Sequence, residues 1–579
     1  MNARYMRSLL FGLGAAALAT SAGAEPREEF TWKTVVNNTI PMPGDAKRRT
    51  FNSYNQPSVN MEGLVVIRAR SRGGMGSQGG GQPTHGIYTR DMSDDASVIT
   101  RILDRTTQVP GPNNLETTFV ETPSFPRIDM DSDTIATRGN HQPVWRYGSG
   151  GDETRAGTTG IYANPFGELI TGAAKLGNIS DYGFFEVPEF PGTMFEVFPG
   201  SPSVARGDTI VFKGNYTAQD QGKTGVYFRR LENGLHGGYS PVVLIANNTD
   251  TFIPGTKTRF GSTSPPSAAG NKVVFAGFDD EANPTLGGIY LAPLQYFPRL
   301  TTVVSIGGDV PGEAPGATFN GLGEGGAFDG RFVAFWGAWG EQTRTVRLYC
   351  STEGNKDRIA FCNQNLTCRG TGETLGDSNS VCDDTDDPNY NEDPDLRRCY
   401  QDKDVPAHQG LFVHDTNTRK TWPVAKIGED YDEFLYWNYS GKTPCTGGGH
   451  SEEGGEDDGE PARWRSSAFV AVAGRGATFR AAFKARTGEF SNKVFVDPVD
   501  GIYLARWPAA AHDAIVTVLD TTMGGQTLDS DAPAESKITE LGIEREGLRG
   551  KWLVINASMG VEGEGEEDGM AGVYAAELK

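Results

Sequence analysis

The sequence has no long apolar run beyond its first residues, and no long segment with the 3.6-residue apolar period of an amphipathic helix. The first absence argues against a membrane-spanning helix, because a span needs about 18 consecutive apolar residues. The second argues against a helical protein. Glycine is abundant instead, with 76 residues among 579, and there are 33 prolines. This composition indicates an all-β protein of many short strands joined by turns.

The motifs of common enzyme classes are also missing. The sequence contains no His-Glu-x-x-His and no Gly-x-Ser-x-Gly. Two Gly-Lys-Thr triplets, Gly222–Thr224 and Gly441–Thr443, lack the earlier glycine of a phosphate-binding loop, because Thr217 and Tyr436 stand in its place. The seven histidines show no spacing typical of metal ligands. No catalytic residue can therefore be assigned from a motif.

Basic residues are few relative to acidic ones. The chain has 53 Lys and Arg against 74 Asp and Glu, with a formal net charge of -21. Nucleic acids and anionic membranes both depend on Lys and Arg to neutralise phosphate, so neither is expected as a partner. The plainer consequence of the charge is solubility.

The start of the chain differs from the rest. Arg4 and Arg7 precede an apolar run, Leu9–Ala19, which leads to the small residues Ala22-Gly23-Ala24. This order is typical of an export signal with its cleavage site. We therefore expect a signal peptide over residues 1–24 and an exported protein, either periplasmic or extracellular.

One pattern recurs along the remaining chain. A turn glycine precedes a β-branched or aromatic strand that ends in a small residue, and a polar loop then leads to a Gly-Ile-Tyr or Gly-Val-Tyr strand. The hydrophobic position of the first strand is held in seven copies by Ile67, Thr137, Phe212, Phe275, Phe335, Phe483 and Ile555. The small position follows two residues later as Ala69, Gly139, Gly214, Gly277, Gly337, Ala485 and Ala557. The second strand begins at Gly86, Gly160, Gly225, Gly288, Gly410, Gly501 and Gly572.

Each copy holds three or four strands, which is the size of a propeller blade. The chain begins in mid-copy with Trp32–Val36 and ends just after Gly572-Val573-Tyr574. The first strand can therefore complete the last sheet and leave no open edge. We predict a seven-bladed β-propeller over residues 25–579, closed by its two termini. An open β-solenoid and two smaller propellers are the alternatives.

Two polar stretches lengthen the interval between the fifth and sixth copies to about twice the others. They are residues 350–408 and residues 441–460, and both are poor in residues that favour strands. We interpret them as surface insertions in one blade.

The segment Asn60–Ile67 resembles the unit of bacterial exported proteins called NxxGxxAF tandem-repeat or choice-of-anchor proteins. In later copies the glycine, for example Gly207 or Gly270, stands one residue further from the hydrophobic position. The resemblance implies an extracellular, propeller-like protein. That family has no assigned reaction, so the resemblance carries over no catalytic residue.

Directly after the hydrophobic position comes a column of residues that we call the collar positions. They are Arg68, Arg138, Lys213, Ala276, Trp336, Lys484 and Asn556. If these strand ends surround one mouth of the ring, their cations and the tryptophan form a site for an anionic ligand such as an acidic polysaccharide. The alternative, which we favour, is structural: each cation pairs with an acid of the adjoining blade, or lies along an apolar wall with its charged end in water, because stacked units need the same contact at every junction.

Two further polar groups follow equivalent strands. His141 lies in a polar and aromatic loop after the second copy, and Asp279-Asp280-Glu281 follows the fourth. Paired carboxylates across a channel could hydrolyse a glycosidic bond. The plainer interpretations are a loop histidine and a solvated turn, and we favour both.

All six cysteines lie in one polar window: Cys350, Cys362, Cys368, Cys382, Cys399 and Cys445. An even number in an exported chain predicts disulfides, and the absence of a Cys-x-x-Cys pair disfavours a metal cluster. The sequence does not choose among the pairings. Between two of these cysteines, oxygen ligands alternate in the manner of a calcium loop, at Asp387, Asn389, Asn391 and Asp393. A solvated acidic loop is the alternative.

Taken together, these features favour an exported, non-catalytic propeller that binds a glycan, a matrix component or a protein partner at the cell exterior. A hydrolase or lyase of acidic polysaccharide is the first alternative, with His141, Asp279, Asp280 and the collar at one mouth. A structural surface protein is the second. Calcium is the one cofactor that a pattern suggests.

Overall fold

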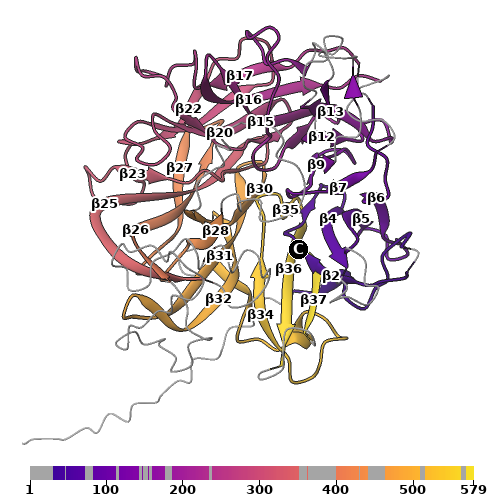
Figure 1. Ribbon diagram of the computed structural model, residues 1–579. Coiled ribbons are helices and arrows are strands. Elements are labelled where there is room, and N and C mark those ends of the chain that lie inside the picture. The colour runs from indigo at the N-terminus through magenta and orange to yellow at the C-terminus, as the bar shows by residue number, and fades with distance from the viewer. Residues whose placement is uncertain are drawn as a thin grey trace, which may run out of the picture.

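The computed structural model describes residues 30–45, 47–71, 83–111, 117–141, 146–147, 154–155, 159–175, 185–233, 238–350, 362, 400–429, 431–440, 463–508, 515–561 and 569–579. Among these residues the named elements are strands and one 3₁₀ helix, η5 (Gly525–Thr527). Seven antiparallel sheets stand around a central axis as the blades of a propeller (Figure 1). The predicted all-β, seven-bladed β-propeller is confirmed. No described helix has the length and apolarity needed to cross a membrane.

The blades are numbered in chain order. Blade 1 contains β2 (Phe51–Tyr54), β3 (Ser58–Val59), β4 (Leu64–Ser71), β5 (His85–Asp91) and β6 (Thr100–Asp104). Blade 2 contains β7 (Phe119–Glu121), β8 (Arg127–Ile128), β9 (Ile135–His141), β12 (Thr159–Ala163) and β13 (Ile170–Ala174). Blade 3 contains β14 (Ser203–Ala205), β15 (Thr209–Ala218), β16 (Gln221–Arg230) and β17 (Val243–Asn247). Blade 4 contains β18 (Ser262–Thr263), β19 (Ser267–Ala269), β20 (Lys272–Phe278), β21 (Gly287–Pro293) and β22 (Thr301–Ser305).

The remaining blades are built in the same order. Blade 5 contains β23 (Phe319–Leu322), β24 (Ala327–Phe328), β25 (Phe332–Tyr349), β26 (Tyr400–Asp415) and β27 (Lys420–Lys426). Blade 6 contains β30 (Val470–Arg475), β31 (Thr478–Ser491), β32 (Val494–Trp507) and β33 (Ile515–Asp520). Blade 7 contains β34 (Lys537–Gly542), β35 (Leu548–Arg549), β36 (Trp552–Gly560), β37 (Met570–Glu577) and β1 (Trp32–Asn37). Two small hairpins are separate: β10 (Arg146–Tyr147) with β11 (Thr154–Arg155), and β28 (Tyr436–Ser440) with β29 (Arg463–Ser467).

The inner strands form a closed ring around the axis. Each of β3, β8, β14, β19, β24, β30 and β35 contacts the inner strand of the next blade, and β35 contacts β3. Main-chain groups take part in this contact: Val59 N–H donates to Glu546 O over 3.1 Å, from blade 1 to blade 7. The ring therefore leaves no gap between the last blade and the first.

Strand β1 closes the ring from the other end of the sequence. It is the outer strand of blade 7 and pairs antiparallel with β37, so that Thr34 lies opposite Tyr574 and Val36 opposite Val573. In Figure 1 the yellow strands β36 and β37 lie beside the indigo strands of blade 1. The predicted sharing of one sheet by the two ends of the chain is confirmed, and it covers the edge of β37 that an open array would expose.

The seven copies of the repeat have the same register in all seven blades. The Gly-x-Tyr strand of each copy is the third strand of its blade. The hydrophobic position pairs with the tyrosine of this strand, or with Phe412 in blade 5; Phe212, for example, pairs with Tyr227. The small position pairs with the glycine of the third strand, as Gly214 pairs with Gly225. The ladder to the outer strand shifts register beside this same tyrosine or Phe412 in every blade. A β-bulge at that point increases the twist of each blade.

Glycine is required at this bulge because the tyrosine lies over it. A Cβ atom on Gly225 would stand 2.6 Å from the Tyr227 hydroxyl and 2.8 Å from the carbonyl oxygen of Ala246 in the outer strand. The corresponding distance to the tyrosine hydroxyl is also 2.6 Å at Gly501 and Gly572. Residues two apart in a strand lie on the same face, which explains the fixed Gly-x-Tyr spacing.

The tyrosine also meets an aromatic ring from the segment before the inner strand. The two rings lie edge to face, with centroids 4.8 Å apart for Phe119 and Tyr162 and 4.9 Å apart for Phe195 and Tyr227. Equivalent pairs occur in blades 1, 4, 5 and 6. In blade 7, the Tyr574 hydroxyl instead donates to Asp529 Oδ2 over 3.0 Å. These aromatic pairs form the core of each blade.

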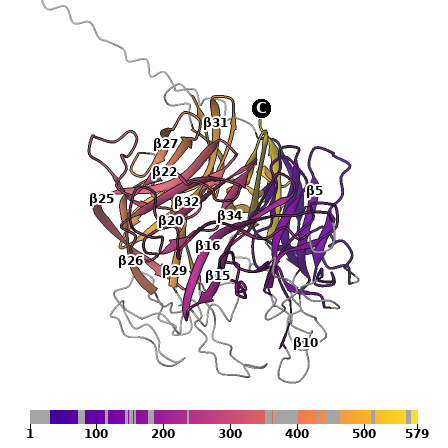
Figure 2. The same cartoon turned by 90° about the horizontal axis from the view of Figure 1, so that it is seen from above.

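Long hairpins extend from one side of the disc. In Figure 2, β10, β29 and the extended ends of β15 and β26 lie on that side. The hairpin β25–β26 is tied to the turn between β31 and β32, because Lys493 Nζ lies 2.5 Å from Asp402 Oδ2 and the Arg347 N–H donates to the carbonyl of Lys493 over 2.8 Å. The predicted insertion includes residues 400–408. In the structure these residues instead lie in β26 and lengthen this hairpin.

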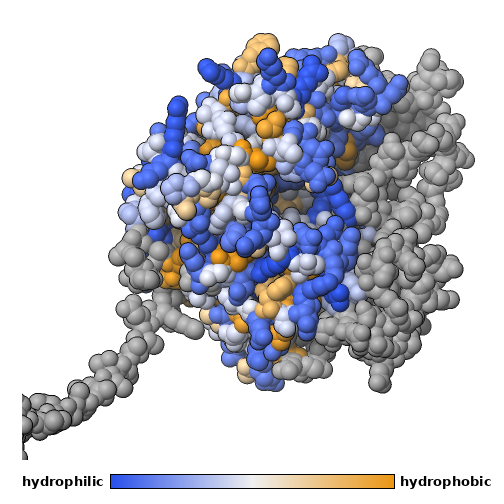
Figure 3. All heavy atoms as spheres, turned by 90° about the vertical axis from the view of Figure 1, so that its left-hand side faces the viewer, coloured by the Kyte–Doolittle hydropathy of each residue, from blue (hydrophilic) through white to orange (hydrophobic). Residues whose placement is uncertain are grey.

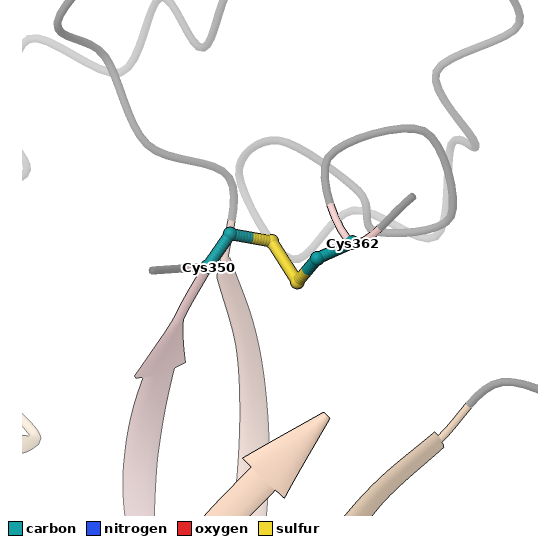
Figure 4. The surroundings of a disulfide bond; sticks show 2 residues. All are labelled: Cys350 and Cys362. Carbon is teal, nitrogen blue, oxygen red and sulfur yellow. A yellow bond between two sulfur atoms is a disulfide. The ribbon is translucent and has the colours of Figure 1, made fainter. Parts of the chain in front are cut away.

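One predicted disulfide lies at the end of β25. Cys350 is bonded to Cys362, which is the first pair in the cysteine window (Figure 4). The other four cysteines, Cys368, Cys382, Cys399 and Cys445, lie outside the described residues. The prediction of a disulfide-bearing insertion is confirmed for this one bridge.

The outer surface fits a protein exposed to water. Figure 3 shows the left-hand side of Figure 1, where hydrophilic residues predominate and apolar ones occur in small separate groups. The apolar residues are instead gathered in clusters between neighbouring blades, such as the one that joins Val35, Tyr88 and Trp552.

Substitution of Gly225 by alanine tests the bulge. The new Cβ has no room between Tyr227 and Ala246, so we expect a loss of about 1–3 kcal/mol in stability and a lower Tm in thermal unfolding. Gly222→Ala is the matched control, because Gly222 lies in the same strand with no atom within 4 Å of the added carbon. Equal Tm values for the two variants would contradict this account of the repeat.

Candidate functional site

The central channel opens into a cavity of about 750 Å³, which we call the mouth cavity. It is lined by residues at or just before the starts of β8, β14, β19, β24, β30 and β35, so it lies where six inner strands begin. The hairpin β28–β29 and the loop between β20 and β21 form its outer part. Binding sites in folded proteins are usually concave and few, so this cavity is the candidate site.

Two arginines and one glutamate form the floor of the mouth cavity. Glu544 Oε1 lies 3.2 Å from Arg127 Nη2 and 3.7 Å from Arg545 Nε. Arg127 is almost completely buried, and its Nε and Nη1 atoms have no hydrogen-bond partner in the described part of the chain. Arg545 Nη1 donates to the carbonyl of Pro265 over 3.3 Å. The floor thus brings blades 2, 4 and 7 together.

The floor is positively charged at neutral pH. Burial alone would raise the pKa of Glu544, but the guanidinium groups of Arg127 and Arg545 outweigh it and hold that pKa below its ordinary value. Burial also lowers the pKa of Arg545, to about 10. Glu544 and Arg545 are therefore both charged at neutral pH. The floor thus places two arginines beside one carboxylate.

Cations and aromatic rings also dominate the outer part of the cavity. In β29, Arg463 Nη2 lies 2.5 Å from Glu281 Oε1, which belongs to the loop of blade 4. In sequence, Trp464 lies between the two arginines of this strand. The centroid of its ring is 5.3 Å from that of the Tyr439 ring. Trp336 and Trp437 also line the cavity, and Trp336 Nε1 donates to Gln409 Oε1 over 3.0 Å.

The charges that line the mouth cavity are opposite in sign to the chain as a whole. Among the described residues of the lining, the cations number five and the carboxylates three: Arg127, Lys403, Arg463, Arg465 and Arg545 against Glu281, Glu324 and Glu544. The excess is 5 − 3 = 2 positive charges in a chain with a formal net charge of -21.

The cationic collar positions have different partners. Arg68 donates to the carbonyl of Thr122 in blade 2, and Arg138 Nη1 donates to the carbonyl of Phe198 over 2.9 Å, just before blade 3. Lys484 Nζ lies 3.7 Å from Asp500 and 3.9 Å from the centre of the Tyr436 ring. Arg68 and Arg138 thus join neighbouring blades through main-chain carbonyls, whereas Lys484 pairs with an acid of its own blade.

Lys213 differs from the other cations of the collar. Its ammonium has no hydrogen bond or ion pair with the residues that the structure describes. Burial lowers its pKa, while Glu324 and Glu281, both in the wall of the mouth cavity, act to raise it. Lys213 and Trp336 are therefore the collar residues that lie nearest the candidate site. Ala276 and Asn556 occupy the equivalent strand positions in blades 4 and 7 without lining it.

The remaining predicted site residues are not among the described residues that line the cavity. The main chain of His141 ends β9, and its side chain is outside the described residues, as are Asp387, Asn389, Asn391 and Asp393. Asp279 accepts hydrogen bonds from Thr285 and Leu286, and Asp280 from Ala282 and Asn283. Both carboxylates thus hold their own turn. No group of three metal-ligating side chains occurs within the described ranges.

Sequence reasoning missed the floor and the hairpin. Arg127, Glu544 and Arg545 lie at the starts of inner strands, which the repeat alignment did not include. The signal for the hairpin was present, because Arg463-Trp464-Arg465 is a basic and aromatic triplet directly after an acidic insertion.

Comparisons with known proteins leave the activity open. No protein family model matches the chain, and no curated protein sequence does. A solved structure of prolyl oligopeptidase B from Galerina marginata aligns over 90% of this chain and 48% of its own, at 8% identity and a TM-score of 0.34. This chain thus spans about half the length of that structure.

Two other solved structures align over half of this chain. They are a Hadza microbial sialidase, at 12% identity with a TM-score of 0.25, and a glycosyl hydrolase from Bacteroides ovatus, at 11% identity with a TM-score of 0.24. The alignments cover 50% and 54% of this chain, and 57% and 90% of those chains. Likenesses of this size carry no argument about activity.

Replacing Glu544 by glutamine tests the floor. It removes the carboxylate that both buried guanidinium groups contact, so we expect a loss of about 3–5 kcal/mol in stability. The pKa of Glu544 is lower in the folded protein than in the unfolded chain. The wild type should therefore be more stable than Glu544→Gln by the full amount above the ordinary carboxyl pKa of 4.5, and by less as the pH falls below it. Thermal unfolding from pH 3 to pH 7 measures both.

Glu281→Gln is the control for this experiment, since Glu281 also binds arginines but is 45% exposed. It should cost about 1 kcal/mol or less, with little dependence on pH. A Glu544→Gln variant as stable as Glu281→Gln at pH 7 would show that the floor pair does not hold the blades together.

Proposed function

We propose that this protein is an exported propeller that binds an acidic glycan in the mouth cavity. The observation that carries the proposal is the excess of cations in that cavity within a strongly acidic chain. Arginine and lysine bind carboxylates through charge-assisted hydrogen bonds, which are about twice as strong as neutral ones. A ligand with several carboxylates would be attracted to the cavity and repelled by most of the remaining surface.

The tryptophans support a ring-shaped ligand. Trp336, Trp437 and Trp464 come from blade 5 and from the two strands of the β28–β29 hairpin, and all three line one cavity. Aromatic rings offer large, rigid contact areas with a polar N–H at one end. Sugar rings with alternating apolar faces and hydroxyl edges fit such walls. The cavity volume of about 750 Å³ has room for a short oligosaccharide.

Binding is better supported than hydrolysis by the state of the carboxylates. A glycosidase needs one carboxyl group that remains protonated to act as the acid. The pKa of Glu544 is lowered by its arginines, and Glu281 is paired with Arg463. Among the described residues of the lining, Glu324 is the one other carboxylate, and one carboxylate does not make the required pair. A hydrolase or lyase that acts on the same ligand is the second candidate, because these three groups share one cavity.

The proposed place of binding rests on the signal peptide expected over residues 1–24. Such a signal would direct the protein to the periplasm or outside the cell, where acidic polysaccharides occur. The resemblance to choice-of-anchor repeat proteins supports the same location. The disulfide between Cys350 and Cys362 fits an oxidising compartment.

Calorimetric titration of the mature protein with tetragalacturonate tests the proposal. We expect binding that weakens as salt is added, because exposed charges are screened, and none to the neutral methyl ester of the same tetrasaccharide. Lys403→Glu should weaken binding about tenfold or more, since Lys403 lines the cavity from β26. Lys257→Glu is the control, because Lys257 is exposed and far from the cavity lining.

Equal binding of the acid and its ester, or equal effects of the two lysine variants, would refute the proposal. Product analysis of the same mixtures after long incubation separates binding from cleavage. Shorter or unsaturated oligosaccharides in that analysis would favour the enzyme.

A further inference from the structure

The clearest polar contact across the mouth cavity joins blade 4 to the β28–β29 hairpin. Glu281 Oε1 lies 2.5 Å from Arg463 Nη2 and 3.8 Å from Arg465 Nη2. Arg463 and Glu281 are 182 positions apart in the sequence. The two arginines lie two residues apart in β29 and therefore on one face of that strand. Among the described residues, Glu281 is thus a carboxylate that contacts both guanidinium groups.

The loop that carries Glu281 is ordered by its other acids. Asp279 Oδ1 accepts from the main-chain N–H groups of Thr285 and Leu286, both over 2.9 Å. Asp280 Oδ1 accepts from the N–H of Ala282 over 2.9 Å. These bonds fix the main chain on both sides of Glu281. Its side chain can therefore leave the arginines while the loop keeps its shape.

All three members of the contact are partly open to solvent. The exposed fractions of the side chains are 45% for Glu281, 34% for Arg463 and 36% for Arg465. A ligand can reach them without any movement of the blades. Ion pairs at this level of exposure are weak, and double-mutant cycles put them at about 0.2–1 kcal/mol.

We infer that Glu281 is an internal substitute for the ligand, and that a carboxylate of the bound glycan replaces it on Arg463 and Arg465. This inference rests on the proposed function and names the part of the ligand that is recognised. The group must be a carboxylate, or one with its shape and charge, because a carboxylate already fills the position. The planar forks of arginine match two carboxylate oxygens and discriminate against a hydroxyl or an ester.

The exchange has a measurable consequence for affinity. Ligand binding must first break the internal pair, so the wild type binds more weakly than a variant without Glu281. The weak internal pair limits this difference to about twofold to fivefold. A strongly charged ligand would still displace Glu281, and after dissociation the side chain would return to the arginines.

The test compares two neutral replacements in the same cavity, Glu281→Gln and Glu324→Gln. Both remove one carboxylate from the lining, but Glu324 has no ion pair or hydrogen bond with the residues that the structure describes. With galacturonate as the probe, we expect Glu281→Gln to bind about twofold to fivefold more tightly than the wild type. The gain from Glu324→Gln should be clearly smaller, because it reports only the change in charge.

Arg463→Met provides the second arm. On its own it should weaken galacturonate binding about tenfold, and Glu281→Gln should add no gain in the Arg463→Met background. If the Arg463→Met variant shows no detectable binding, Arg463 is required for binding. The comparison of Glu281→Gln with Glu324→Gln then tests the inference by itself. Equal gains from Glu281→Gln and Glu324→Gln, or a gain that persists without Arg463, would overturn the inference.

The two proposals fail in different ways. If neither the wild type nor any variant binds galacturonate or its oligomers, the proposed function is wrong. If the wild type binds and Glu281→Gln binds no more tightly, the cavity is a glycan site but Glu281 is not a substitute for the ligand.

Discussion

The structure depends on the pairing of β1 with β37. This antiparallel contact joins residues from the two ends of the chain and supplies the outer strand of blade 7. Without it, blade 7 would expose the edge of β37, and hydrophobic residues shared by blades 7 and 1, such as Val35 and Trp552, would lose their partners. The floor of the mouth cavity depends on the same closure, because Arg127 of blade 2 reaches Glu544 of blade 7 across blade 1. The candidate site therefore requires the complete ring.

Within each blade a second constraint acts locally. The tyrosine of the third strand lies over a glycine two residues earlier, at a bulge in the outer ladder. The same tyrosine, or Phe412, packs edge to face against an aromatic ring in six blades. Sequence could reveal this pattern because two adjacent strands repeat it at fixed spacing. The blade count followed from that spacing, and the closure followed from the half-copies at the two ends of the chain.

The site was much harder to foresee, for a physical reason. Arg68 and Arg138 recur at the same strand position, where each joins its blade to a main-chain carbonyl of the next one. The residues that make the cavity distinctive do not repeat. Arg127 and Arg545 differ from their equivalents in other blades, and the β28–β29 hairpin occurs once. A search for repeats finds the scaffold and passes over such exceptions. The turn held by Asp279 and Asp280 also occurs outside the repeat, but it could be predicted, because consecutive acids commonly hold loops.

Closure of the ring by its termini is the central claim, and an engineered cross-link tests it most directly. Lys33 lies opposite Ala575 in the pairing of β1 with β37. In the variant Lys33→Cys with Ala575→Cys, peptide mapping of the oxidised monomer should recover a disulfide between these two positions. The Tm should exceed that of Lys33→Cys alone, because the bridge constrains almost the whole unfolded chain. A bridge found only between two molecules, or none at all, would contradict the closed ring and the cavity built on it.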